Sequence, residues 1–443
     1  MKIFKALDSF YILILNTIVA ASSGISLLMR KRLLNASLFC LNLIFITAYC
    51  NDRIKDLTHY KDYVLVTSTV LLIVVLIMSA DRRIELTEYP KRRILFSIGW
   101  YLCFTAIFIS SLKYYVRDAY FLWSILSLTL FPMLMIVWHR RGDYFYLCNV
   151  VAQSMVISSY LFYLANFVLV PFVTNDGIYG PDYLGLADNP NGNGMIVLPF
   201  FTAALYMLLS RRGSSFPYIL SLLLSVVFAT ISNTRAAQAA MLLETVVAVC
   251  IYVRHRNILA RHRLSLIFKA LLAAVLLASM AGYVLHYADN IDLNAYAESE
   301  MEEAAEEVRQ SEVLTNINNL ASGRLILWKA YLKMVSFGGH GNPDGPLFEP
   351  YAESKWAHNN ALDIWYASGF LAFAGYVLWL LAVWIFVLRC IFSKKLFRQE
   401  YLFTALAFTG YFIEAMLEIT IYPMQTGIVF LAFVTIGPAA FEE

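Results

Sequence analysis

The chain has 443 residues, of which 60% are hydrophobic and 15% are charged, and its mean hydropathy is +0.63. Soluble domains are about half apolar and a quarter charged, so this composition excludes an ordinary soluble domain. The formal net charge is only +3, and we expect no nucleic-acid partner.

Apolar runs that are long enough to cross a bilayer recur along the whole chain. A transmembrane helix needs about 20 predominantly apolar residues, and only helices satisfy their own backbone hydrogen bonds inside lipid. The sequence therefore predicts an all-α protein, a polytopic integral membrane helical bundle of about 12–13 transmembrane helices with one large external helical loop. The apolar segments are residues 8–29, 33–50, 62–80, 94–113, 119–138, 144–172, 193–210, 216–232, 236–253, 265–287, 357–388, 400–421 and 424–440.

The connections between these segments are of two kinds, because some are rich in lysine and arginine and the others are not. The two sets alternate along the chain, and the positive-inside rule assigns the basic set to the cytoplasm. An odd number of spans then places Lys2 and Lys5 outside, and an even number places both termini inside. The sequence leaves both open, because the first segment contains Ser22-Ser23-Gly24 and can be broken there. The basic connections are Arg30 to Arg32, Arg82 to Arg93, Arg140 and Arg141, Arg211 and Arg212, Arg254 to Lys269, and Arg389 to Arg398.

The apolar segments divide the chain into four regions. Residues 1–172 hold N-terminal transmembrane helices, and residues 173–287 hold transmembrane helices with short external turns. Residues 288–356 are long enough for an external, periplasmic loop subdomain, and residues 357–443 hold the C-terminal transmembrane helices. A glutamate-rich run at 298–307 opens the loop and is typical of a solvated surface helix.

Two external turns carry residues that are suited to binding an anion. Asn191 lies in the run Asp-Asn-Pro-Asn-Gly-Asn-Gly that enters a helix, where free N–H groups can hold an anion or simply be capped. Arg235 follows Ser-Asn-Thr in a very short turn between two spans. An unpaired arginine at membrane depth is costly, so we expect Arg235 to face a polar cavity or an anionic partner unless it reaches the surface.

A third external position, Arg324, opens a run with the apolar spacing of an amphipathic interfacial helix. A cation at a helix N-terminus is electrostatically unfavourable. We therefore expect an anionic group to compensate Arg324, although a solvated arginine explains the same run. Two arginines together are a natural clamp for a diphosphate.

The last external position is His358, followed by Asn359, at the outer mouth of a long apolar segment. A histidine there can act as a base or simply be an interfacial polar residue. Glu414 and Glu418 are four residues apart, so a continuous helix places them on one face, where they can hold an arginine, orient His358 or form a structural ion pair. We find no set of metal ligands on the external side and expect neither a metal nor another cofactor.

Together these residues resemble the O-antigen ligase and polymerase superfamily. The resemblance rests on a Gly-Arg at 323–324 and a His-Asn at 358–359 that bracket the large external loop, with Gly369 beyond them. It extends to the Asn-Pro-Asn turn at 189–191, to Thr-Arg at 234–235 and to the late acidic residue Glu418, and it covers roughly residues 185–425.

The resemblance implies a metal-independent, inverting glycosyltransferase of the bacterial inner membrane with its active site facing the periplasm. A glycan on undecaprenyl diphosphate would pass to a sugar hydroxyl, with His358 as general base and with Arg235 and Arg324 as catalytic residues that bind the diphosphate. Asn191, Asn359 and Glu418 would contact substrates. Lipid A–core is the acceptor of the ligases, another repeat unit is the acceptor of the polymerases, and membrane lipids surround the protein.

Three other readings remain open alongside O-antigen ligase. An O-antigen or capsular repeat-unit polymerase is the nearest. A polysaccharide transporter or flippase is the second, but transporters place charged residues near the bilayer midplane between similar halves, and this chain gathers its polar residues at one surface. A purely structural membrane scaffold is the third, and it gives no reason for the histidine and arginines.

Overall fold

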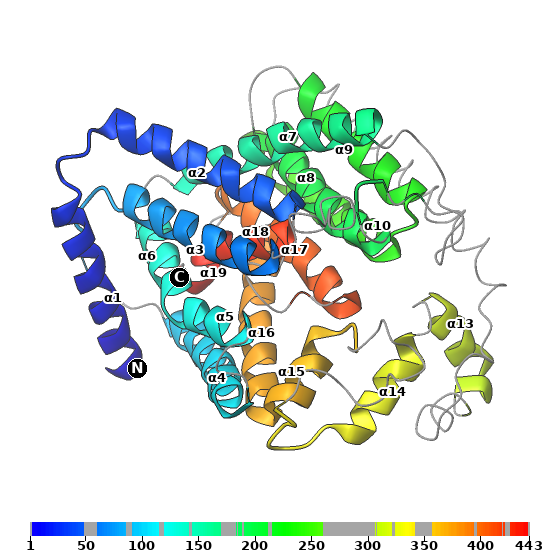
Figure 1. Ribbon diagram of the computed structural model, residues 1–443. Coiled ribbons are helices and arrows are strands. Elements are labelled where there is room, and N and C mark those ends of the chain that lie inside the picture. The colour runs from blue at the N-terminus through cyan, green and yellow to red at the C-terminus, as the bar shows by residue number, and fades with distance from the viewer. Residues whose placement is uncertain are drawn as a thin grey trace.

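The computed structural model describes residues 2–47, 60–85, 91–114, 119–140, 144–169, 183, 185–187, 190–210, 215–259, 306, 308–320, 324–341, 357–393, 397–418, 420 and 426–441. All regular structure in these ranges is helical, which confirms the predicted all-α class (Figure 1). The helices are α1 (Lys2–Ala21), α2 (Leu27–Thr47), α3 (Tyr60–Ser79), α4 (Lys91–Tyr114), α5 (Ala119–Leu128), α6 (Leu130–Arg140), α7 (Tyr144–Leu169), α8 (Pro190–Ser210), α9 (Phe216–Ile231), α10 (Arg235–Leu259), α13 (Glu312–Leu320), α14 (Arg324–Met334), α15 (Asn360–Ser368), α16 (Phe370–Phe392), α17 (Tyr401–Leu417), α18 (Gly427–Thr435) and α19 (Gly437–Phe441).

Within the described ranges, seven helices are long and apolar enough to cross a membrane, and four apolar helices are shorter. This confirms the polytopic membrane bundle. The predicted span 265–287, most of the glutamate-rich run and residues 342–356 lie outside the described residues. The seven are Lys2–Ala21, Arg93–Leu112, Phe121–His139, Tyr144–Leu169, Asn191–Ser210, Arg235–His255 and Phe370–Phe392, and the shorter ones are Val66–Ser79, Phe216–Ile231, Tyr401–Leu417 and Gly427–Phe441.

The predicted segment 8–29 is divided at residues 22–26, next to the break that the sequence left open at Ser22 to Gly24. Helix α1 ends at Ala21, the chain turns, and α2 already contains Arg30, whose side chain is buried. The Arg30 guanidinium donates hydrogen bonds to the carbonyls of Ser22, Ile77 (3.2 Å) and Ala80 (3.2 Å). It thereby satisfies carbonyls that the ends of α1 and α3 leave without helical partners. One arginine of the basic connections is thus a buried capping group.

The predicted segment 357–388 is two helices, because the chain breaks at Gly369 with φ +84°. Gly339, in the loop that follows α14, has φ +73° and lies directly against Gly369, and a Cβ on either glycine would collide with the other's backbone. The loop docks there through its main chain, with His340 N–H donating to Tyr366 O (2.8 Å) and Phe370 N–H donating to Phe337 O (2.9 Å). Two glycines therefore fix this loop on the end of α15.

Helices α4 and α16 pack against each other along their length. Gly99 on α4 and Gly375 on α16 face the partner helix so closely that a Cβ on either would meet the other helix's backbone. Small residues allow this approach, which is the usual basis of tight helix packing in membranes. The aromatic rings of Trp100, Trp379 and Phe433 fill the space beside this contact.

Helix α8 is buried on all sides and fixes the relative direction of α10 and α17. Near its start, Gly194 packs against Thr234 at the start of α10, and its Thr202 donates to Glu244 Oε1 (2.8 Å) farther along α10, so α8 and α10 run parallel. The end of α8 meets the start of α17, where Gln399 Nε2 donates to Ser210 O, so α17 runs the opposite way. The N-termini of α8 and α10 and the C-terminus of α17 therefore lie at one end of the bundle.

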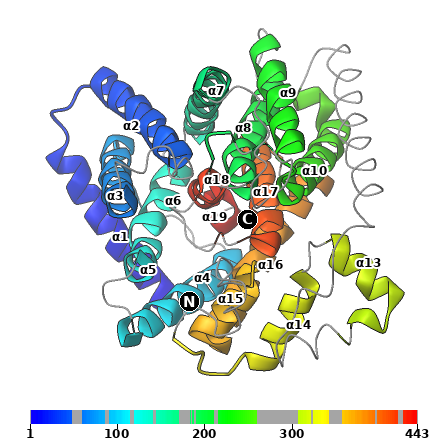
Figure 2. The ribbon, with the colours of Figure 1, turned by 45° about the vertical axis from the view of Figure 1, so that its right-hand side comes forward.

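A second, smaller core lies beside this bundle. Figures 1 and 2 show α13 and α14 at the lower right, next to α15. The core joins α14 to α15 and to residues flanking both helices. It consists of Val308, Ile326, Leu327, Ala330, Tyr331, Ala357, Leu362 and Tyr366. A helix is present after Arg324 as α14, and its buried residues pack against the start of α15.

Candidate active site

Arg324 and Glu418 form an ion pair across 94 positions of sequence. Arg324 is the first residue of α14, and its Nη2 lies 2.5 Å from Glu418 Oε1 while its Nη1 donates to the carbonyl of Leu417. Only 14% of the Arg324 side chain and 4% of the Glu418 side chain are exposed to solvent. Glu418 is therefore the anionic group that compensates a cation at the N-terminus of α14.

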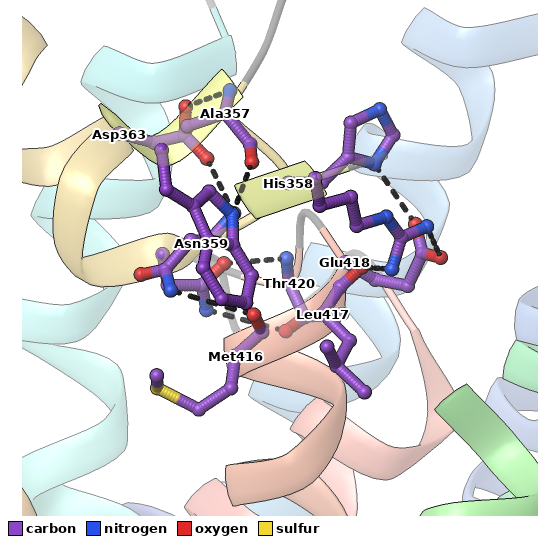
Figure 3. A network of polar contacts seen from close by, with 11 residues as sticks. Ala357, His358, Asn359, Asp363, Met416, Leu417, Glu418 and Thr420 are labelled. Carbon is purple, nitrogen blue, oxygen red and sulfur yellow. Dashed lines mark hydrogen bonds and ion pairs between the residues drawn. The ribbon is translucent and has the colours of Figure 1, made fainter. Parts of the chain in front are cut away.

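His358 contacts the other oxygen of the same carboxylate. Its Nδ1 lies 3.1 Å from Glu418 Oε2, and 23% of its side chain is exposed (Figure 3). A carboxylate only accepts hydrogen bonds, so Nδ1 carries the proton and Nε2 is the basic nitrogen of the neutral ring. One carboxylate thus orients the histidine and holds the arginine beside it.

The position of Glu418 depends on where α17 ends. The Glu418 N–H still donates to Glu414 O (2.6 Å), but the backbone at Glu418 is extended, with φ −143° and ψ 171°. Helix α17 therefore ends at Leu417, and Glu418 does not lie within a continuous helix as the sequence-based expectation required. Glu418 turns toward Arg324 and His358, whereas Glu414 stays within α17 and is buried.

Asn359 begins α15 as its N-cap. Its side-chain oxygen accepts from the N–H groups of Ala361 (3.1 Å) and Leu362 (3.3 Å), which the first turn would otherwise leave without partners. Its amide nitrogen also donates to Met416 O (3.4 Å) near the end of α17. Asn359 is buried, so these contacts support a structural role in addition to the substrate contact expected from the sequence.

The next residue, Asn360, fixes α15 on the segment that follows α17. Its Oδ1 accepts from Thr420 N (2.8 Å), and its Nδ2 donates to Thr420 Oγ1 (3.2 Å). Both residues are fully buried. Asn359 bonds to Met416 near the end of α17, and Asn360 bonds to Thr420 just after it. These hydrogen bonds hold His358 at a fixed distance from Glu418.

Asp363, in the first turn of α15, is also part of this hydrogen-bond network. Its Oδ1 accepts from Ala357 N (2.8 Å), and its Oδ2 accepts from Asn359 N (3.3 Å), so the carboxyl group bridges the residues on either side of His358 (Figure 3). Burial raises the pKa of the Asp363 carboxyl to about 6, against the opposing effects of the Ala357 N–H and of the nearby His358.

Arg235 and Asn191 lie at the same end of the bundle as His358, a placement that follows from the register of the helices. Arg235 is the first residue of α10, and Asn191 lies in the first turn of α8. Gly410 on α17 touches Glu244 on α10, which sets the register of these antiparallel helices. At 1.5 Å per residue, Arg235 lies about 14 Å beyond that contact and Glu418 about 12 Å, so the two residues are level.

Most of these residues stand at helix N-termini. Arg235 opens α10, Arg324 opens α14, and His358 immediately precedes the N-cap of α15. The helix dipole makes such ends favourable to anions, although Asn359 already accepts from first-turn N–H groups of α15. The arrangement therefore suits a ligand with several negative charges.

No group of three or more His, Cys, Asp or Glu side chains that could hold a metal ion occurs in the part of the chain that the structure describes. His340, in the loop that follows α14, stacks on Tyr366 at 4.4 Å between ring centroids, and its Nε2 lies 2.8 Å from Met334 O. His340 therefore supports the docking of the loop on α15.

Of the six residues expected from the sequence, the structure brings four into one network: His358, Asn359, Arg324 and Glu418. Arg235 and Asn191 are placed at the same end by register alone. Sequence reasoning missed Asp363, although an acidic residue four positions after the N-cap Asn359 is a detectable signal for a first-turn capping contact.

Residues 220–377 match the family model described as O-antigen ligase. The resemblance to the O-antigen ligase and polymerase superfamily is thereby confirmed for a segment that contains Arg235, Arg324 and His358. The match implies a glycosyltransferase-like membrane enzyme with glycan or lipid-linked substrates in general. No curated protein and no solved structure gives a significant match.

Proposed function

We propose that this chain, whose residues 220–377 match the O-antigen ligase family, transfers a glycan from undecaprenyl diphosphate to a sugar hydroxyl. The observation that carries the proposal is the contact of Glu418 with both His358 and Arg324. It joins a base to a cation that can neutralise a diphosphate. Within the superfamily we propose the ligase reaction, with lipid A–core as acceptor, and the description of the matched family model supports this choice.

In the proposed reaction His358 acts as general base. Its Nδ1–H donates to Glu418, so Nε2 takes the proton of the acceptor hydroxyl as that oxygen attacks the anomeric carbon. The new carbon–oxygen bond forms while the bond from the anomeric carbon to the diphosphate oxygen breaks, and the diphosphate leaves with the electron pair. Glu418 stabilises the imidazolium that results, and direct displacement inverts the anomeric configuration.

Arg324 and Arg235 bind the diphosphate in this scheme. A guanidinium has five N–H donors, and the contacts of Arg324 with Leu417 and Glu418 leave donors for phosphate oxygens. Arg235 is level with Glu418 at the start of α10 and supplies the second cation. The two arginines take the place of a divalent ion, so neither a metal nor another cofactor is required.

The proposed location is the bacterial inner membrane, with the site facing the periplasm. The support is the basic bias of the opposite connections, such as Arg254 to Lys269, and the attachment of the site to the external helix α14. A lipid-linked donor that has been flipped to that face reaches the site from the membrane, and no nucleotide sugar is needed there.

Purified protein in lipid nanodiscs, given an undecaprenyl-diphosphate glycan and lipid A–core, tests the proposal. Formation of glycan-bearing lipid A–core in excess EDTA is the expected result. Chain extension on the lipid carrier would assign the polymerase reaction instead. Movement of the lipid-linked glycan across a sealed vesicle without a new glycosidic bond would assign a transporter and overturn the proposal.

A further inference from the structure

We propose that Asp363 is a positioning residue for the reaction, holding the backbone on both sides of His358 so that the imidazole keeps its place against Glu418. The inference rests on the proposed function, because it assumes that His358 is the base. Asp363 is not among the residues expected from the sequence, and its carboxyl group contacts only peptide N–H groups among the hydrogen bonds that the structure records.

The two hydrogen bonds of the Asp363 carboxyl group, which we call the bracket, hold the backbone on both sides of His358. One carboxyl oxygen of Asp363 lies 2.8 Å from Ala357 N and the other lies 3.3 Å from Asn359 N, so the two contacts flank His358. His358 itself has φ +49°, the left-handed region that side chains other than glycine rarely adopt. Such a conformation persists only where the surroundings impose it, and the Asp363 contacts supply that constraint.

The bracket is buried, and the Ala357 carbonyl next to it is held by a further hydrogen bond. Asp363 is 3% exposed and Ala357 is fully buried. The carbonyl of Ala357, which begins the peptide leading into His358, accepts from Trp328 Nε1 (2.9 Å) on α14. Ala357 is thus bonded through both its N–H and its carbonyl, and His358 is the partly exposed residue between fixed neighbours.

A carboxylate suits this position better than an amide. Two peptide N–H groups need two acceptors, and a carboxylate offers an acceptor at each oxygen. An asparagine offers one acceptor and one NH2 group, and the NH2 group would face an N–H donor. Asp363→Asn therefore breaks one side of the bracket while preserving the size and shape of the side chain.

The same contacts also cap the first turn of α15, so a purely structural role must be separated from a positioning role. A structural residue would lower folding stability and would act whether or not His358 is present. A positioning residue lowers kcat with little change in donor binding, and its effect disappears when His358 is gone, because it acts only through that ring.

The test is a double-mutant cycle in nanodiscs. Asp363→Asn is expected to lower kcat by about 10- to 100-fold, as a small displacement of a catalytic group does. The KM for the undecaprenyl-diphosphate donor should change less than about twofold. In the His358→Ala background, Asp363→Asn should leave the residual transfer rate unchanged. Ser110→Ala is the matched control, since it removes a hydrogen bond to Ala367 at the far end of α15 (3.1 Å) and should leave kcat unchanged.

Two results overturn the proposal. One is wild-type kcat in a folded Asp363→Asn protein, and the other is an equal loss in both backgrounds. If Asp363→Asn does not insert, Asp363→Glu decides by the same criteria, because it keeps the charge and displaces the carboxylate by one methylene. Full activity of His358→Ala would refute the base in the proposed function, whereas an inactive His358→Ala with a fully active Asp363→Asn would refute only the bracket.

Discussion

Glu418 Oε2 lies 3.1 Å from His358 Nδ1, and this contact joins the residue after α17 to the residue before the N-cap of α15. The same carboxylate holds Arg324 through its other oxygen. The proposed base, the carboxylate that contacts it and the cation proposed to bind the leaving group are thus linked through one side chain. The consequences below are measurable in the protein reconstituted in nanodiscs.

Glu418→Gln is expected to lower kcat by about 10²–10⁴-fold, because the neutral amide cannot stabilise the protonated imidazole. A buried charge that loses its partner costs about 3–5 kcal/mol. Glutamine keeps one acceptor for Arg324, so the loss of folding stability should fall below that range. Steady-state transfer and thermal unfolding measure the two effects. Glu306→Gln, which breaks the exposed pair with Arg309 (3.8 Å), is the control and should change neither.

Arg235→Lys and Arg324→Lys are each expected to transfer poorly, and the alanine variants to be inactive. A guanidinium group donates two hydrogen bonds at once to the oxygens of a phosphate, whereas an ammonium group acts as a point charge. Arg324→Lys should also lose stability, because lysine cannot reproduce the separate contacts with Leu417 O and Glu418. Binding of undecaprenyl diphosphate and transfer rates provide the comparison. Wild-type rates in both lysine variants would show that the arginines serve only as charges.

His358→Ala is expected to lose about 10²–10⁴-fold in transfer while it still inserts and binds undecaprenyl diphosphate. His340→Ala is the matched control. His340 lies on the loop, stacks on Tyr366 and contacts Met334 O, so its loss should affect loop stability more than catalysis. Full activity of His358→Ala between pH 6 and 8 would show that another group is the base.

The pH dependence should carry a contribution from Asp363. Above about pH 6 its carboxyl is ionised and both oxygens accept, and as the pH falls through about 6 one oxygen gains a proton and no longer accepts a peptide N–H. Transfer should therefore decrease as the pH falls through about 6. His358, Glu418 and Arg324 are the nearby charged groups, and they are unchanged in Asp363→Asn. In a plot of log kcat against pH, that variant should fall less steeply toward acid pH than the wild-type protein does. Equal slopes for the two proteins would contradict this assignment.

The orientation in the membrane gives the fifth prediction. A cysteine at position 310, beside α13, should react with an impermeant thiol reagent added from outside, and a cysteine at position 258, near the end of α10, should not. Labelling intact cells and then permeabilised cells measures this. The reverse pattern would place the site on the cytoplasmic side and exclude a periplasmic donor.

The sequence by itself determined the membrane class, the all-α fold and most of the long helices. Hydropathy is a local property, and a run of about 20 apolar residues has few alternatives to a transmembrane helix. Local patterns also marked Arg324 and His358, because polar residues next to apolar spans stand out against their surroundings. The ends of some helices were less visible in the sequence. Helix α1 ends at Ala21 and α15 ends at Ser368, although both ends fall within runs that remain apolar.

Only the tertiary structure decided which groups meet. Glu418 is 94 residues from Arg324 and 60 residues from His358, and no local spacing relates them. Their contact depends on α17 ending at Leu417 and on α14 packing over α15, both of which follow from the whole bundle. The role proposed for Asp363 depends on the left-handed backbone at His358, a conformation that the pattern of side chains in the sequence does not encode.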